Sequence, residues 1–527
     1  MEQGRKFKRV LVANRGEIAI RIFRACKELG IRSVAIYSEE DKNTLFRTKA
    51  DEAYQVGRGK SPVDAYLAID EIIELAKAKG VDAIHPGYGF LAENVEFAKA
   101  CEEEGIVFIG PDHTMMDNLG DKVKSKIVAN KVGVPTIPGM TETIPSEEVA
   151  LKFAEDCGYP VMLKAAAGGG GRGMRIVRSR EEMPEQFRSA KSEAKKAFGI
   201  DDIFIEKYLE RPKHIEVQIL GDNYGNIVHL YERDCSIQRR HQKVVEFTPA
   251  LSITEEQRQN ICADAKKIAQ AVNYKSAGTV EFLVDHEGNH YFIEMNPRIQ
   301  VEHTVTEMTT GIDIVQSQIL IAEGYSLDSD EINIKSQDQI QPRGFSIQCR
   351  LTTEDPINGF APDTGVITKY TSAGGYGIRL DAGNAFVNAV ISPYYDSLLV
   401  KVTSWARSFN DAVNKAKRAL KEMKVTGVKT NRAFLLNVLN HPTFRAGNCD
   451  TGFIADNPEL FNIMVREDKE LKVLTYLGEK FVNGNRGVKP QFDVPVFPRL
   501  KPEETAGLSG TKQILDEKGP EGLVDWV

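Results

Sequence analysis

The first 112 residues alternate short apolar runs with helical repeats, and this alternation constrains the fold more than any other feature of the sequence. Arg9–Ala13 is a short apolar run, and the apolar residues that follow it recur at helical spacing. Ser33–Tyr37 is the next such run, and similar runs lie at 82–84 and 106–109. Strands that alternate with helices predict a parallel sheet covered by helices. We therefore expect an α/β fold with a Rossmann-like N-terminal sheet over residues 1–112.

The length and composition exclude several classes of protein. At roughly 150 residues per domain, the 527 residues predict three or four domains. The net charge of −7 lacks the basic excess that non-specific nucleic-acid binding requires, so we expect no nucleic-acid partner. There is no run of eighteen apolar residues, which argues against a membrane partner. Seven scattered cysteines without a C-x-x-C pair favour a reducing cytoplasm, and we interpret the N-terminus as mature protein without a leader.

The sequence predicts five further segments after the N-terminal sheet. A polar linker helix is expected over 113–136, followed by a small lid at 137–208 that contains a glycine run. Hairpins then dominate, so 209–330 is expected to be a mixed α+β catalytic part. A further α+β part is expected at 331–460, and a Pro/Gly-rich linker at 461–527.

The glycine run Gly168–Met174 is predicted to be a hairpin loop that holds phosphates. It follows the apolar run Val161–Ala165 and precedes Met174–Arg178, which reads as a second strand rather than the helix of a Rossmann turn. No Lys-Ser/Thr follows the glycines, so a Walker loop is also excluded. Unhindered backbone N–H groups together with Lys164 suit a polyphosphate. The alternative is a loop that is only flexible.

The segment Ile293–Glu302 alternates apolar and polar residues without a break, which places its polar groups on one face in an extended chain. Pro297 should end the strand, and the alternative explanation is a half-exposed edge strand. Glu281, on the other strand of the expected hairpin, points to the same face as Glu294. Two carboxylates and the Asn296 amide oxygen form a ligand set for Mg²⁺, or for the similar cation Mn²⁺.

The segment Arg233–Lys243 concentrates four cations and a histidine in an acidic protein. A solvated charge run is the usual explanation. Because no aromatic residues are interleaved, the functional alternative is a loop that binds a small anion rather than a nucleic acid. Cys235 is interpreted as a structural cysteine.

Taken together, these motifs resemble the biotin carboxylases of the ATP-grasp superfamily. The resemblance runs from about residue 5 to 455 and rests on several segments in order: Asn14–Ala19, His85–Leu91, Lys164 with the glycine run, Phe204–Leu209, Arg233–Lys243, Glu281, and Glu294–His303. It implies an ATP-grasp fold in which the N-terminal sheet, the lid and the mixed C-terminal part share one site.

The resemblance also implies roles for individual residues. ATP would be bound by Lys122, Lys164, Gly169, Gly170, Gly171, Glu206, Lys207, Leu209, His214, Gln238 and His241. Mg²⁺ would be held by Glu281, Glu294 and Asn296. Bicarbonate and biotin would be bound by Lys243, Arg298, Gln300, Val301, Arg350 and Tyr88. Glu302 would be the general base, Lys243 and Arg298 would bind bicarbonate, and Arg350 would stabilise the enolate of biotin.

The implied activity is ATP- and bicarbonate-dependent carboxylation of biotin at N1′ through carboxyphosphate. Segments 454–460 and 474–484 are similar to the region that follows this part in the pyruvate carboxylases, which implies the first half-reaction of oxaloacetate formation. Biotin would come from a carrier domain outside this sequence, as would the carboxyltransferase. The resemblance further implies a homodimer or higher oligomer and acetyl-CoA as a possible effector. Alternatives are a subunit of an acyl-CoA carboxylase, an ATP-grasp ligase that joins a carboxylate to an amine, and a silent regulatory module.

Overall fold

The structure is a computed structural model that divides into two compact units, residues 1–463 and 464–527. It describes residues 6–120, 122–140, 142–165, 174–198, 202–463 and 477. The predicted linker at 461–527 therefore lies almost wholly outside the described residues, and the fold below is that of the first unit.

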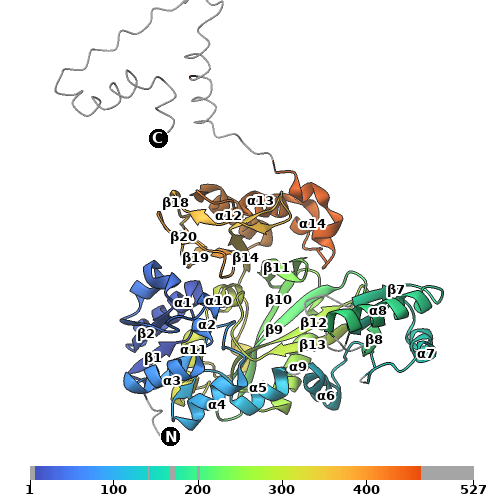
Figure 1. Cartoon of the computed structure of the whole chain (residues 1–527), viewed down its shortest axis with the longest axis horizontal. Helices are drawn as coiled ribbons and strands as arrows, with labels where there is room; N and C mark the ends of the chain where they lie inside the picture. The colour runs from blue at the N-terminus through green and yellow to red at the C-terminus, as the bar shows by residue number, and fades with distance from the viewer. Residues whose placement is uncertain are drawn as a thin grey trace, which may run out of the picture. The chain divides into compact units, whose positions relative to one another are not determined.

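The N-terminal part, drawn in blue in Figure 1, is a parallel sheet with the strand order β3-β2-β1-β4-β5. Its strands are β1 (Arg9–Val12), β2 (Arg32–Tyr37), β3 (Glu52–Gln55), β4 (Ala83–His85) and β5 (Val107–Phe108). Its helices are α1 (Gly16–Glu28), α2 (Pro62–Tyr66), α3 (Ile69–Ala78) and α4 (Val95–Glu103). Strands β1, β2 and β4 are buried on both faces, which is why they read as continuous apolar runs. The predicted Rossmann-like sheet is confirmed.

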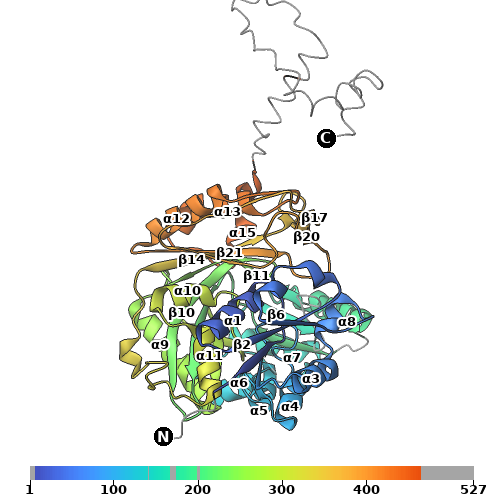
Figure 2. The same cartoon turned by 90° about the vertical axis from the view of Figure 1, so that its left-hand side faces the viewer.

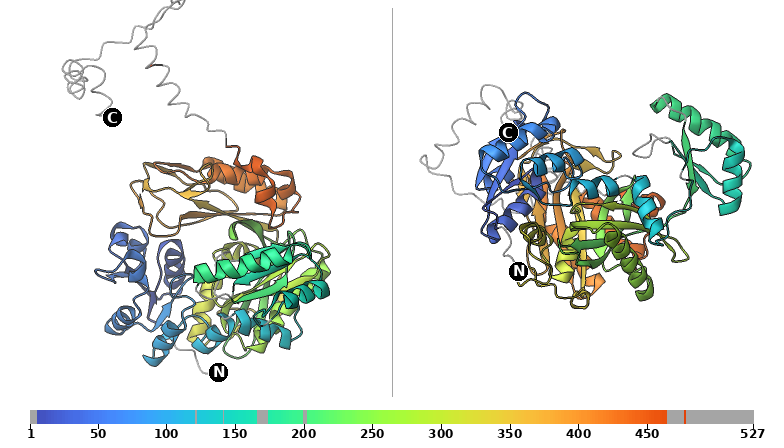
Figure 3. Two further views of the ribbon diagram at one scale, coloured as in Figure 1. Left: turned by 45° about the vertical axis from the view of Figure 1, so that its right-hand side comes forward. Right: turned by 90° about the horizontal axis from the view of Figure 1, so that it is seen from below.

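A second, three-stranded sheet lies in the segment that the sequence predicts to be the lid. Helices α5 (His113–Gly120) and α6 (Lys122–Lys131) lead to it. Its strands are β6 (Val161–Ala165), β7 (Met174–Val177) and β8 (Ile203–Lys207), in the order β7-β6-β8. Figure 3 shows α7 (Glu147–Cys157) and α8 (Met183–Phe198) packed against this sheet. The predicted hairpin of β6 and β7 is antiparallel as expected, whereas the glycine loop between them lies outside the described residues.

The largest sheet has eight strands in the order β13-β12-β9-β10-β11-β14-β21-β19, and all its neighbours are antiparallel. The strands are β9 (Lys213–Gly221), β10 (Ile227–Arg239), β11 (Gln242–Thr248), β12 (Ser276–Val284), β13 (His290–Asn296), β14 (Phe345–Thr352), β19 (Ile378–Ala382) and β21 (Leu398–Ala406). One sheet thus continues across residue 330, where the sequence suggested a division between two parts.

The prediction of a basic loop at Arg233–Lys243 is wrong. Strand β10 runs to Arg239, a two-residue turn follows at Arg240 and His241 with positive φ, and β11 begins at Gln242. The segment forms a hairpin in which buried partners neutralise the charges that point inward. Arg233, for example, is fully buried beside Glu216.

Helices cover both halves of the large sheet. They are α9 (Glu255–Ala271), α10 (His303–Thr310), α11 (Ile314–Glu323), α12 (Phe409–Glu422), α13 (Arg432–Asn440), α14 (Pro442–Arg445) and α15 (Phe453–Asp456). Figure 2 shows α12 and α13 over β14 and β21. Thr254 and Gln257 form a capping box at α9, and Gly311 ends α10 in the left-handed conformation.

Short strands complete the C-terminal part: β15 (Glu354–Asp355), β16 (Ala361–Pro362), β17 (Gly365–Val366), β18 (Lys369–Thr371), β20 (Val390–Ile391) and β22 (Lys424–Thr426). Among the described residues, no helix combines the length and the apolar character needed to span a membrane.

Candidate active site

The predicted carboxylate pair lies together on the β12–β13 hairpin. Glu281 and Glu294 are directly paired across the two strands, so both side chains lie on the same face of the sheet. Asn296 ends β13, and its Nδ2 donates to Glu281 Oε1 at 2.9 Å. The donor set consists of carboxylate and amide oxygens, which fits a hard dication such as Mg²⁺.

Lys243 lies among three buried carboxylates. Its Nζ donates to Glu281 Oε1 at 3.0 Å and to Glu302 Oε1 at 2.7 Å, and it also pairs with Glu216. Burial disfavours a charged amine, but these carboxylates outweigh it and raise the pKa of Lys243 well above its usual value. The lysine is therefore a fixed cation at the centre of the site.

Glu302 is fully buried and held by cations on both of its oxygens. Oε1 accepts from Lys243, and Oε2 accepts from Arg350 Nη2 at 3.1 Å. Burial alone would raise its pKa, but Lys243 and Arg350 hold the pKa of this carboxyl well below its usual range. Glu302 is consequently ionised, and it immediately precedes helix α10.

A chain of close polar contacts joins Gln238 and His214 to Glu281. Gln238 Nε2 lies 2.7 Å from His214 Nδ1, and His214 Nε2 lies 2.8 Å from Glu281 Oε2. Because the amide nitrogen can only donate, Nδ1 is assigned as the acceptor of this hydrogen bond. His241, by contrast, is exposed at the turn between β10 and β11.

Arg298 and Gln300 follow the hairpin and present hydrogen-bond donors beside it. Arg298 Nη1 donates to Gln300 Oε1 at 2.9 Å, and Arg298 Nε pairs with Glu93 Oε2 at 2.8 Å. Gln300 Nε2 is buried and has no hydrogen-bond partner among the described residues. A buried donor left open beside a guanidinium suits the oxygen atom of a small anion.

Tyr88 and Val301 are connected through the buried side chains of Glu17 and Lys401. The Tyr88 hydroxyl donates to Glu17 Oε1, which also pairs with Lys401 Nζ at 3.0 Å. The same Nζ donates to the Val301 carbonyl at 3.1 Å. The amide of Val301, to which the resemblance gives a role in binding bicarbonate, keeps that role as a prediction.

On the lid, the predicted nucleotide residues are paired with one another. Lys164 pairs with Glu206, and Lys126 lies 3.7 Å from the same carboxylate. Lys207 Nζ instead donates to the carbonyls of Gly158 and Tyr159 at 2.9 and 3.0 Å. Leu209 is half-buried. The Lys122 side chain and the loop glycines Gly169, Gly170 and Gly171 lie outside the described residues.

A cavity of about 520 Å³ opens beside the carboxylate pair. It is lined by Glu93, Val95, Met116, Asp117, Leu119, Gly120, Glu294, Met295 and Asn296. It therefore reaches from the N-terminal part and α5 to the end of β13, and it brings Glu294 and Asn296 to one open space.

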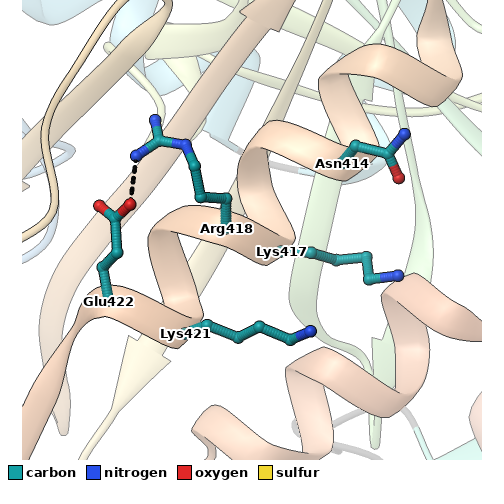
Figure 4. A pocket seen from close by; sticks show the side chains of 5 residues that line it. All are labelled: Asn414, Lys417, Arg418, Lys421 and Glu422. Carbon is teal, nitrogen blue, oxygen red and sulfur yellow. Dashed lines mark hydrogen bonds and ion pairs between the residues drawn. The ribbon is translucent and has the colours of Figure 1, made fainter.

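A separate pocket of about 480 Å³ lies along α12 (Figure 4). Arg418 pairs with Glu422 at 2.7 Å, while Lys417 and Lys421 point to the other side of the helix. Asn414 completes the lining. Because none of the predicted site residues lines it, this pocket is not the candidate active site.

Sequence reasoning missed several residues that hold the site together. Glu216 pairs with both Lys243 and Arg233 and is fully buried, and Glu246 pairs with Arg350. The signal for Glu216 was present, since His214, Glu216 and Gln218 alternate with apolar residues in the same way as Ile293–Glu302.

Known proteins share both the sequence and the fold of this chain. Residues 6–116 match the family "Biotin carboxylase, N-terminal domain", residues 121–330 the family "Carbamoyl-phosphate synthase L chain, ATP binding domain", and residues 348–456 the family "Biotin carboxylase C-terminal domain". The biotin carboxylase domain of the Hydrogenobacter thermophilus 2-oxoglutarate carboxylase, solved with MgADP, ADP and bicarbonate, is 50% identical. That match covers 86% of this chain and 98% of the other, with a TM-score of 0.79.

The chain therefore belongs to the biotin carboxylase family and has its ATP-grasp fold. It is also similar to whole pyruvate carboxylases. The Bacillus subtilis enzyme is 57% identical over 98% of this chain, which corresponds to 45% of that protein. A Rhizobium etli pyruvate carboxylase solved with the allosteric activator acetyl coenzyme-A is 50% identical, with a TM-score of 0.81, and the match covers 99% of this chain and 47% of that one. The chain thus spans about half the length of these relatives.

Proposed function

We propose that this chain carboxylates biotin at N1′ at the expense of ATP and bicarbonate. The observation that carries the proposal is the placement of Glu302, an ionised carboxylate between Lys243 and Arg350. It ends a segment in which Arg298 and Gln300 offer donors to an anion. A base, two cations and an open amide donor are the groups needed to bind and activate bicarbonate.

Glu302 is proposed as the base that removes the bicarbonate proton. Bicarbonate would accept hydrogen bonds from Lys243, Arg298, Gln300 and the Val301 amide. When Lys243 also interacts with this second anion, it stabilises the negative charge of Glu302 less strongly. The affinity of Glu302 for a proton then rises. The deprotonated oxygen then attacks the γ-phosphorus, a new P–O bond forms, the bond to ADP breaks, and carboxyphosphate results.

The carboxylates of Glu281 and Glu294, with Asn296 beside them, are the residues that would hold Mg²⁺. The ion, or Mn²⁺ in its place, would neutralise phosphate oxygens so that an anion can approach. Lys243 already offsets part of the charge on Glu281, and His214 orients the other oxygen of that carboxylate.

ATP is proposed to lie between the lid and the large sheet. Lys122, Lys164 and the loop glycines would contact the phosphates, and opening the Lys164–Glu206 pair would free the lysine for them. Glu206, Lys207 and Leu209 would meet the adenine, while His214, Gln238 and His241 would line the site on the side of the sheet. Closure of the lid would keep water from the mixed anhydride.

On the biotin side, Arg350 and Tyr88 are the proposed contacts. Carboxyphosphate breaks down to CO₂ and phosphate, the released phosphate accepts the N1′ proton of biotin, and the nitrogen forms a bond to CO₂. The negative charge that develops on the ureido oxygen needs a fixed cation, and Arg350 is buried and held in place by Glu246 and Glu302.

We further propose that this is the first half-reaction of a pyruvate carboxylase. The pyruvate carboxylases named above support it, and in that case a carrier domain would bring biotin and a carboxyltransferase would form oxaloacetate.

A dimer is proposed because the related carboxylase domain was solved as a dimer. Acetyl-CoA is proposed as an effector because the Rhizobium etli enzyme was solved with it as an allosteric activator. A cytoplasmic location stays a prediction, supported by seven unpaired cysteines. The subunit of an acyl-CoA carboxylase is the second candidate.

The test is ADP release measured with and without bicarbonate and free biotin. The proposal predicts release that needs bicarbonate and is stimulated by biotin. Release that needs neither would contradict the proposal, and release that depends on an added amine would favour the amine-ligase alternative. Absence of Mg-ATP binding in calorimetry would favour the silent module.

A further inference from the structure

Lys401 is a fully buried lysine on β21 that the proposed reaction leaves without a role. It lies directly opposite Arg350 on the neighbouring strand β14. Like charges at opposite positions of antiparallel strands repel one another, so such a pair needs compensation on both sides. Arg350 has Glu246 and Glu302, whereas Lys401 has the Glu17 carboxylate at 3.0 Å and the Val301 carbonyl at 3.1 Å.

The two cations therefore hold two consecutive residues of one segment. Arg350 donates to the side chain of Glu302, and Lys401 donates to the carbonyl of Val301. This carbonyl belongs to the peptide unit whose nitrogen is that of Glu302. A donor fixed on the Val301 oxygen sets the orientation of this peptide plane, and so it constrains where the Glu302 side chain begins.

The contact of Lys401 with Glu17 connects the lysine to Tyr88, a proposed contact of biotin. Glu17, at the start of α1, accepts from Lys401 and from the Tyr88 hydroxyl on the same oxygen. The Glu17 side chain is 4% exposed, so an unpaired charge there would be costly. Across β21 and β19, Lys401 also lies opposite Asp381, and Arg379 pairs with that carboxylate at 2.7 Å. Lys401 is held from several sides and has little freedom to move.

We propose that Lys401 is a positioning residue that fixes the Val301–Glu302 peptide and, through Glu17, the Tyr88 hydroxyl in the arrangement that turnover requires. The inference rests on the proposed carboxylation of biotin. If Lys401 only connected α1 to the large sheet, its ion pair with Glu17 would be sufficient. The additional bond to Val301, one residue before the proposed base, is what links the lysine to the reaction.

The test compares Lys401→Met with the matched control Lys415→Met. Lys415 also lies against the large sheet and donates to a backbone carbonyl, that of Trp405, at the same distance of 3.1 Å, but it contacts none of the proposed site residues. Because misplacement of reacting groups by about 1 Å can cost about 10²-fold in rate, Lys401→Met should lower kcat by that order. Its Kd for Mg-ATP should stay that of the wild type, and Lys415→Met should keep both constants.

Glu17→Gln, which keeps the shape of the side chain, provides a second variant if Lys401→Met fails to fold. Glu17→Gln should lower kcat in the same way. The double variant should reduce kcat by a smaller factor than the product of the two single reductions, because both substitutions remove the same contact. Wild-type kcat in either folded variant, or a loss of Mg-ATP binding in step with a lower melting temperature, would overturn the positioning role. A wild-type enzyme without bicarbonate-dependent ADP release would instead overturn the proposed function.

Discussion

Lys243 Nζ lies 2.7 Å from Glu302 Oε1, so the proposed base and a proposed ligand of its substrate are bonded to each other. A base paired in this way has a low affinity for protons. It becomes effective only when an arriving anion takes over part of the charge of the lysine. The arrangement would therefore keep Glu302 ionised and make its activation depend on bicarbonate.

The first prediction concerns Glu302. Glu302→Gln keeps the size of the side chain but cannot accept the proton, so bicarbonate-dependent ADP release should fall by about 10²- to 10⁴-fold. Mg-ATP binding, measured by calorimetry, should be unchanged. The control is Glu232→Gln, which also alters a buried carboxylate paired with an arginine, Arg258 at 2.8 Å, but one outside the site. Equal losses in both variants would show that burial of charge, not proton transfer, is responsible.

The second prediction concerns the metal. Glu281→Gln removes one of the two proposed carboxylate ligands, so the Mg²⁺ concentration needed for half-maximal activity should rise by about tenfold or more. Glu287→Gln is the control, because Glu287 is exposed at the turn of the same β12–β13 hairpin. An unchanged magnesium dependence in Glu281→Gln would mean that the ion is held elsewhere.

The third prediction concerns the lid. Lys164→Gln removes a cation proposed to contact phosphates, and loss of one charged hydrogen bond should weaken ATP binding by about tenfold. Lys152→Gln, at an exposed position on α7 of the same lid, should bind ATP as the wild type does. If Lys164→Gln binds ATP normally, the Lys164–Glu206 pair would be structural only.

Much of the site was predictable because its pattern is local. Alternation along one strand places Glu294 and Asn296 on a common face without any knowledge of the rest of the fold. The pairing of Glu294 with Glu281 followed from a short hairpin, and the structure confirms it. The parallel N-terminal sheet was predictable for the same reason, since its strands and helices follow one another closely.

What the sequence could not show are contacts between distant strands. Glu216 and Lys243 meet because β9, β10 and β11 pair in a particular register, and Lys401 meets Val301 across 100 residues of sequence. The same limit explains the error at Arg233–Lys243. A run of cations resembles a solvated loop until its buried partner Glu216, from another strand, is known.

The last prediction concerns stability at low pH and follows from His85 on β4. The imidazole is fully buried and its Nδ1 accepts from the Gly87 amide at 3.1 Å, and burial lowers its pKa to about 3. An unfolded histidine has a pKa of about 6.5 and binds a proton first, so stability is lost as the pH falls from there toward 3. At pH 5 the loss is about 2 kcal/mol. Urea unfolding should show a loss of stability between pH 7 and pH 5 in the wild type, and the loss should be smaller by this amount in His85→Gln. His286→Gln, at an exposed turn, should behave as the wild type, and an equal pH difference in all three proteins would exclude His85 as the cause.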